Sequence, residues 1–139
     1  MIQEVVVDCA DPAAQAEFWG TLLGVRQVVR DPSWAVVDAS PVLLAFQAVP
    51  EAKSSPKNRL HLDVQVDDAQ AAVERAVALG ARRLRSELSA SGDGYVVLLD
   101  PEENEFCFVV DTGGQWVGAT RAALDAAPAP DQTWQTRHQ

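Results

Sequence analysis

Residues 61–68, His-Leu-Asp-Val-Gln-Val-Asp-Asp, decide the fold because the same pattern occurs earlier in the chain, at residues 4–12, Glu-Val-Val-Val-Asp-Cys-Ala-Asp-Pro. Each run is strand-like, rich in Val or alternating between apolar and polar residues. The first residue of each run stands seven residues before an aspartate, Asp11 or Asp68, of the type that caps a helix. We therefore expect a strand followed by a helix at both places.

The segments after the two capping residues also follow the same order. Apolar residues at helical spacing predict a helix that ends at Gly24 in the first copy and at Gly80 in the second. Three short apolar runs follow each glycine. The helix residues are Phe18, Trp19, Leu22 and Leu23, then Ala72, Val73, Ala76, Val77 and Leu79; the strands are 25–29, 34–38 and 42–49, then 82–85, 95–99 and 105–110.

A second spacing supports a true duplication. Asp38 precedes Phe46 by eight residues, and Asp100 precedes Phe108 by eight. Repeats of this length indicate units that cover each other's apolar faces. The sequence predicts an α+β fold of two βαβββ modules, with one curled mixed sheet around a concave cup and the helices on its outer face.

The domain boundaries follow from the repeat. We expect a single domain over residues 1–112, with module one at 2–49, a polar linker rich in Pro and Ser at 50–58, and module two at 59–110. Residues 113–139 match neither module and form a C-terminal extension. A short helix is expected there over 119–127, and Trp116 and Trp134 are expected to pack on the domain or on a second subunit.

Composition restricts the class of partner. Of the 139 residues, 47% are apolar and 22% are charged, which is typical of a globular protein, and the net charge of −9 disfavours nucleic acid and anionic membranes. No apolar run is long enough to cross a bilayer, and we expect no signal peptide before the first strand. With two cysteines, Cys9 and Cys107, expected as free thiols, we expect a cytoplasmic protein.

Strand alternation places the polar residues on one face. His61, Asp63 and Gln65 alternate with apolar residues that should meet the helix. By the same rule, Glu4 and Asp8 share the polar face of the first strand, and Glu105 and Cys107 share that of the last strand. These side chains then converge on the sheet face that carries no helix. Such a face is either solvated or a ligand site, and the mixture of His, Glu, Cys and Gln favours a ligand cup.

Several motifs resemble the glyoxalase/bleomycin-resistance/dioxygenase group, the vicinal oxygen chelate superfamily, and within it the glyoxalase-like subgroup. They are the segments 7–12, 16–19, 22–24, 60–64 and 79–81, and the turn 100–106, Asp-Pro-Glu-Glu-Asn-Glu-Phe. The resemblance covers roughly residues 2–110. Glu103 stands where the family turn usually carries glycine, so we expect either a strained hairpin or a hairpin of another type there.

The resemblance also implies metal-ligand positions. In metal-using members, four ligands lie on inner strands, and these positions fall on Glu4, on Gln47 or Ala45, on His61, and on Cys107, where glutamate is usual. Glu4 and His61 match best, and they suit zinc, nickel, manganese or iron. Two ligands hold a divalent ion weakly, so the resemblance favours a site without metal over one with metal.

Two functions follow from the resemblance. One is an enzyme, a lyase, isomerase or dioxygenase acting on a small oxygenated metabolite, with Glu4 or His61 as the proton acceptor. The other is a protein that sequesters a cationic or aromatic compound, which the acidic charge favours. In both, a homodimer binds a small molecule through substrate-binding residues that the cup brings together: Asp8, Trp34, Gln47, Asp63, Tyr95 and Cys107.

Overall fold

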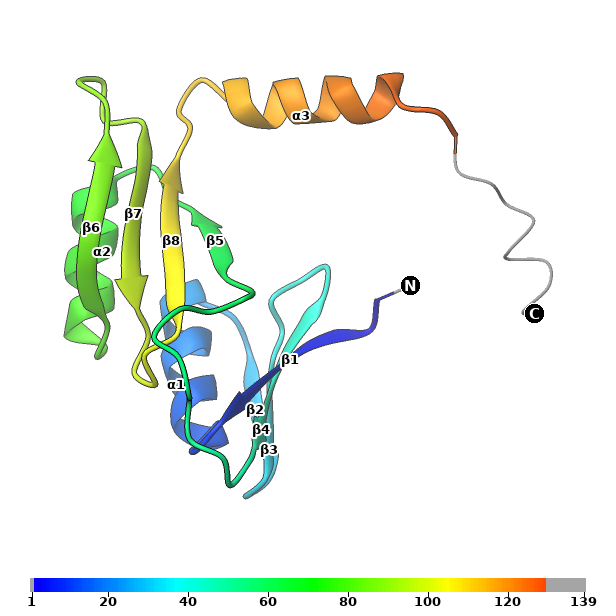
Figure 1. The fold of residues 1–139 in the computed structure, drawn as a ribbon, viewed down its shortest axis with the longest axis vertical. Helices are drawn as coiled ribbons and strands as arrows, with labels where there is room; N and C mark the ends of the chain where they lie inside the picture. Colours follow the sequence, from blue (N-terminus) through cyan, green and yellow to red (C-terminus); the bar gives the residue numbers. More distant parts are fainter. Residues whose placement is uncertain (1, 130–139) are drawn as a thin grey trace.

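The computed structural model describes residues 2–129 and contains eight strands and three helices in that range (Figure 1). The first module comprises β1 (Glu4–Cys9), α1 (Pro12–Leu23), β2 (Gln27–Asp31), β3 (Trp34–Val37) and β4 (Leu43–Ala48). The second comprises β5 (Leu62–Gln65), α2 (Ala69–Ala78), β6 (Arg82–Leu88), β7 (Gly94–Leu99) and β8 (Glu105–Val110). Helix α3 (Gln115–Ala126) follows.

The two modules have the same topology. The first sheet has the order β1-β4-β3-β2 and the second the order β5-β8-β7-β6. In each sheet the first and last strands of the module pair in parallel, and the other pairs are antiparallel. This confirms the α+β fold and the two βαβββ modules.

Both module helices begin at the expected capping residues. The carboxylate of Asp11 accepts a hydrogen bond from the backbone N–H of Ala14, and that of Asp68 accepts one from Ala71, both at 3.1 Å. Helix α1 ends at Gly24, whose φ of 68° is the left-handed conformation that glycine adopts without strain. The order of cap, helix and glycine therefore holds in the first module as the pattern predicted.

A single hydrophobic core joins the modules. Phe18 and Trp19 of α1 are buried and pack edge-on against Phe106 of β8, with ring centroids 6.1 and 4.9 Å away. The core-facing rows of β1 and β5, including Val5 and Leu62, pack against the same cluster. The first module's helix therefore fixes the position of the second sheet.

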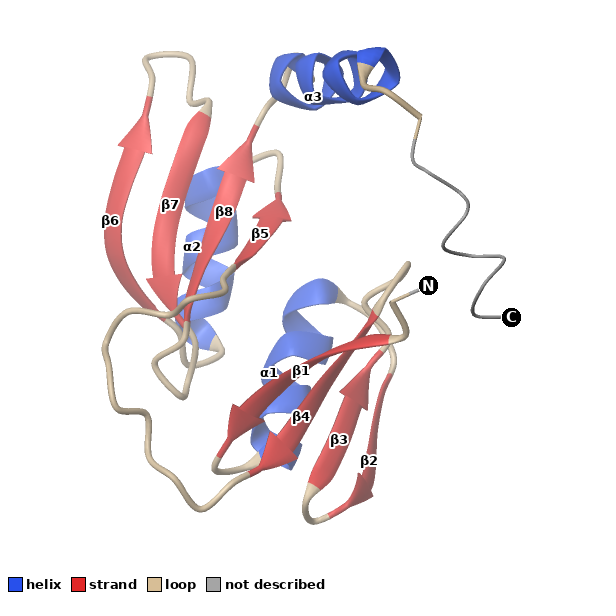
Figure 2. Cartoon of the chain, turned by 45° about the vertical axis from the view of Figure 1, so that its right-hand side comes forward, coloured by secondary structure: helices blue, strands red, loops and turns tan. Residues whose placement is uncertain are grey.

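The two sheets stay open in one chain. They form two separate four-stranded sheets, and Figure 2 shows α1 behind the first sheet and α2 behind the second, leaving the opposite face of each uncovered. The outer position of the helices agrees with the sequence prediction. β1 and β5 are both edge strands, so neither sheet is closed on itself.

Two local details differ from the sequence prediction, and the turn at Glu103 agrees with it. The strand expected at 25–29 begins at Gln27, because Val25 donates its N–H to Gly20 and closes the end of α1. Val77, expected in the apolar stripe of α2, is 48% exposed. Glu103 has a φ of 66°, as expected from the missing glycine.

No helix among residues 2–129 is long and apolar enough to cross a membrane.

Candidate functional site

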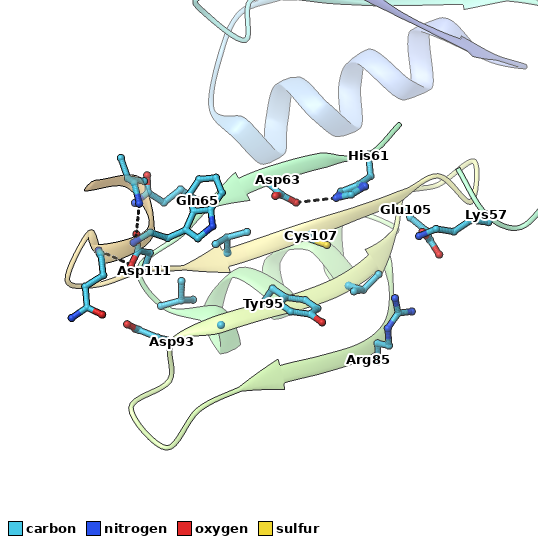
Figure 3. A pocket seen from close by; sticks show the side chains of 17 residues that line it. Lys57, His61, Asp63, Gln65, Arg85, Asp93, Tyr95, Glu105, Cys107 and Asp111 are labelled. Atoms are coloured by element: carbon cyan, nitrogen blue, oxygen red, sulfur yellow. Dashed lines mark hydrogen bonds and ion pairs between the residues drawn. The ribbon is translucent and has the colours of Figure 1, made fainter. Parts of the chain in front are cut away.

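A cavity of about 970 Å³ lies on the open face of the second sheet. Its floor consists of alternate residues of β5, β7 and β8, whose neighbours point to the core. The linker contributes Lys57, β6 contributes Arg85, and the start of α3 closes one end. Figure 3 shows His61, Asp63, Cys107 and Tyr95 on this face, with Glu105 and Lys57 at one end and Asp93 and Asp111 at the other.

His61, Asp63 and Cys107 form a cluster where the edge strand β5 pairs with β8. Asp63 and Cys107 are opposite each other in the parallel pair of β5 and β8, and His61 is two residues before Asp63, so all three side chains share a face. The Nε2 of His61 lies 3.4 Å from a carboxylate oxygen of Asp63. One ligand atom from each of the three residues lies within 4.8 Å of the other two.

The electrostatics of the pocket reflect these contacts. Burial, and then the neighbouring Asp63 carboxylate, raise the pKa of the Cys107 thiol, and the Arg85 guanidinium opposes this only in part. At the edge, the Nζ of Lys57 donates a hydrogen bond to Glu105 at 2.6 Å and lowers the pKa of that carboxyl group. This ion pair ties the linker to the start of β8.

The predicted site residues divide between the two sheets. His61, Asp63, Tyr95 and Cys107 line the cavity together. The other four, Glu4, Asp8, Trp34 and Gln47, lie on the open face of the first sheet, where Asp8 pairs with Gln47 and Gln47 with Trp34 in the strand register. Of these four, only Asp8 lines a second cavity, of about 940 Å³, between β1, the linker and the β7–β8 turn.

The duplication can now be compared position by position. The register pairs Val6 with Ala45 in the first sheet and Asp63 with Cys107 in the second. Val6 and Asp63 each stand five residues before a helix-capping aspartate, so the two pairs are equivalent. Ala45, and not Gln47, is therefore the equivalent of Cys107, and the first module carries no ligand atom at this place.

Comparison with protein-family models identifies the fold family. Residues 4–109 match the model of the glyoxalase-like domain. The chain belongs to this family. The assignment places it in the vicinal oxygen chelate superfamily, as the sequence motifs indicated. No curated protein sequence matches this glyoxalase-like chain.

Solved structures with the same fold include enzymes and binding proteins. A glyoxalase/bleomycin resistance protein/dioxygenase family enzyme from Burkholderia phytofirmans is 22% identical, with a TM-score of 0.64 over 76% of this chain and 94% of its own. The bleomycin-binding protein from Streptomyces verticillus, complexed with copper(II)-bleomycin, is 18% identical, with a TM-score of 0.56 over 80% and 96%.

A third structure is a mutant of the fosfomycin resistance protein FosX from Listeria monocytogenes, complexed with Mn(II) and a dihydroxypropylphosphonic acid. It is 12% identical, with a TM-score of 0.67 over 86% of this chain and 97% of its own. At these identities the likeness shows the fold alone. The function of the glyoxalase-like chain must be argued from its own site.

The donor atoms of the glyoxalase-like pocket fit a divalent metal. An imidazole nitrogen, a carboxylate oxygen and a cysteine sulfur are each a ligand type that zinc binds, and three is the number of protein ligands in catalytic zinc sites. His61 and Cys107 were predicted at two ligand positions, whereas Asp63 was predicted only among the substrate-binding residues. The alternation of polar and apolar residues along β5 places Asp63 on the same face as His61. This pattern could have predicted Asp63 as a third metal ligand.

Other pocket residues were not predicted as site residues. Arg85 is opposite Val97, which is opposite Cys107, so strand register alone places all three on one face. The contributions of Lys57 and Trp116 come from the linker and the extension, where no periodic pattern indicates a direction. Their positions follow only from the tertiary structure.

Proposed function

We propose that this glyoxalase-like protein binds a small oxygenated molecule in the cavity on its second sheet and acts on it as a metal-dependent enzyme of the lyase, isomerase or dioxygenase type. The observation that supports this most directly is the cluster of His61, Asp63 and Cys107, with ligand atoms within 4.8 Å of one another. These three residues would hold the ion. A bound divalent metal polarises the oxygens of a substrate beside it.

The surrounding side chains have separate roles in this proposal. Arg85 is exposed on the same face and orients an anionic group of the substrate, while Tyr95, 42% exposed, offers a ring face and a hydroxyl group. Glu105 is already paired with Lys57 and contributes to shape rather than to proton transfer. With His61 bound to the ion, Glu4 is the proton acceptor.

Glu4 lies on the other sheet, so the proposal includes a homodimer. The open face of the first sheet exposes apolar side chains, including Val6, Val28 and Leu43. Seating this face on the pocket of a second copy would bury these residues and bring Glu4, Asp8, Trp34 and Gln47 to the ligand. A cytoplasmic location, where the thiols stay reduced, completes the proposal.

Metal titration tests the metal site. Zinc, nickel, manganese and iron(II) are titrated into the protein, and retained metal is measured after dialysis. We expect one ion per chain, lost in His61→Ala and weakened in Asp63→Asn and Cys107→Ser. Asp38→Asn is the matched control and should retain the ion, because Asp38 is an exposed carboxylate of the first module that lines neither cavity. Retention of metal by His61→Ala would overturn the proposed site.

Sedimentation tests the dimer. Val28→Glu on the open face of the first sheet should shift the protein to the monomer, because a charge would be buried in the contact. Val77→Glu, an equally exposed valine on the outer face of α2, should not. A monomeric wild-type protein would remove the role proposed for Glu4.

A second function, sequestration, is favoured by the charge of the pocket. Four carboxylates, from Asp63, Asp93, Glu105 and Asp111, line it against two cations, from Lys57 and Arg85. This excess suits a cationic guest that also contacts Tyr95. Bleomycin, the ligand named for one of the structural relatives, is the first probe. Metal-independent binding without turnover would select this function.

A further inference from the structure

Helix α3 lies outside the family match yet contributes to the pocket. The match to the glyoxalase-like domain ends at residue 109, whereas Gln115, Trp116 and Val117 of α3 line the cavity. Figure 1 shows α3 crossing beyond the end of β8 and extending away from the sheets. One end of the pocket is therefore built by a segment that lies outside the residues matched by the family model.

The start of α3 is held firmly in place. Its N-cap residue, Gly114, has no side chain to satisfy the free N–H groups, and Asp111 does so instead. The Asp111 carboxylate accepts hydrogen bonds from the backbone of Gln115, Trp116 and Val117 at 3.0, 3.2 and 3.3 Å. Its negative charge also suits a helix N-terminus. Trp116 therefore has a fixed backbone position.

A second carboxylate secures the connection. Asp93 lies in the β6–β7 turn, directly before β7. Its carboxylate accepts hydrogen bonds from the backbone N–H and the hydroxyl group of Thr112, at 3.4 and 2.9 Å. Asp93 and Asp111 both line the pocket, but their hydrogen bonds are directed at the chain that carries α3. They act as anchors for this wall.

Packing within the chain does not explain the helix. None of the residues of α3 is buried, and Trp116, Val117 and Leu124 are 68%, 52% and 58% exposed. Of these three, Trp116 and Val117 line the pocket and Leu124 does not. The apolar side chains at the anchored end therefore face the ligand cavity.

From these observations we propose that α3 is a wall of the ligand pocket and that the indole of Trp116 packs against a flat, unsaturated part of the bound molecule. Trp116 is then a specificity-determining residue supplied from outside the matched residues 4–109. The inference rests on the proposed function for the presence of a ligand. It does not depend on whether that ligand is transformed or sequestered.

The test uses monobromobimane attached to Cys107 as a tethered flat ligand. Cys107 lies on the pocket floor and is partly accessible, whereas Cys9 is only 5% exposed, so the label goes to Cys107. Tryptophan in contact with bimane quenches its emission. We expect the emission to be quenched in the wild type and the quenching to be lost in Trp116→Phe, which keeps an aromatic wall.

Two further variants control the result. Leu124→Ala, on the same helix but outside the pocket, should leave the quenching unchanged. Asp111→Ala keeps the indole but removes the anchor of α3, so it should reduce the quenching. Equal quenching in wild type and Trp116→Phe would overturn the inference.

The outcome separates this inference from the proposed function. Bimane reads only the position of Trp116 over the pocket, so quenching that depends on Trp116 supports the wall even if no metal binds. If the quenching is unchanged and both Trp116→Phe and Leu124→Ala shift the protein to the monomer, α3 is a subunit contact and the inference is wrong.

Discussion

The carboxylate of Asp100 accepts a hydrogen bond from the side-chain amide of Gln15 at 2.9 Å across a separation of 85 residues. Both residues are buried, and the same oxygen accepts a second bond from the indole of Trp19 at 3.3 Å. Backbone N–H groups of Glu102 and Asn104 bond to the other oxygen. This one carboxylate joins α1 of the first module to the β7–β8 turn of the second.

Replacing Asp100 with alanine should therefore destabilise the whole chain. The change leaves the buried amide of Gln15 and the indole N–H of Trp19 without an acceptor, so we expect a loss of about 3 kcal/mol. Asp38→Ala is the matched control, because Asp38 occupies the equivalent place in the first module but is exposed. Urea unfolding measures both. A comparable loss in the two variants would contradict this account.

A glycine beside the pocket is required by close packing. Gly94 has a φ of 135°, and a Cβ there would lie 2.0 Å from the carbonyl oxygen of Glu87 on β6. Gly94→Ala should cost about 3 kcal/mol or more, because the strand pair must separate. Gly118→Ala, in α3 with nothing within 4 Å, should instead gain up to about 1 kcal/mol. Thermal unfolding that ranks the variants in the reverse order would refute this.

The β7–β8 turn carries strain that glycine would relieve. Glu103 adopts a φ of 66°, a left-handed conformation that costs a residue with a Cβ about 1–2 kcal/mol. Glycine also has more conformational entropy in the unfolded chain, which offsets part of the relieved strain. Glu103→Gly should therefore stabilise the protein by up to about 1 kcal/mol. Chemical denaturation checks the sign, and a loss of stability would show that the Glu103 side chain has a role of its own.

Stability should fall in alkali because of Cys9. Burial raises the pKa of its thiol to about 12 from an ordinary value of 9.0, with Glu102 and other carboxylates adding to the effect. Between these two values the unfolded chain loses the proton and the folded chain keeps it. The contribution is complete below pH 9 and falls by about 1.4 kcal/mol per pH unit above it.

The variant Cys9→Ala isolates this effect. Its stability at pH 7 should be lower because a buried side chain is shortened. Its free energy of unfolding should nevertheless fall less steeply than that of the wild type from pH 8.5 to 10.5, since other titrating groups are common to both proteins. Parallel curves would show that Cys9 is not the cause.

Sequence patterns predicted the modules because each pattern reports a local interaction. Asp11 and Asp68 cap helices through bonds to residues three positions on, and alternation along β5 and β8 separates Leu62 and Phe106 from Asp63 and Cys107. Such signals are contained in a few neighbouring residues. They held even though the two modules share little sequence beyond these positions.

The site was predicted less well because it depends on distances between modules. Glu4 and His61 occupy equivalent places in the repeat, but no local pattern states whether their sheets face each other within one chain. The structure places them on separate open sheets, so residues expected in one cup divide into two groups of four. Trp116 was noted only as a packing residue, since nothing in a polar extension indicates where its helix lies.

Because Val6 and Ala45 are equivalent to Asp63 and Cys107, only one of the two modules carries donor atoms at this place in the sheet. A duplicated fold could carry the same binding position twice. Here the first module has aliphatic side chains at the place where the second module has a carboxylate and a thiol. If the proposed site is correct, metal binding should therefore saturate at one ion per chain. The first module is then free for the other role proposed for it, which is to cover the pocket of a second copy.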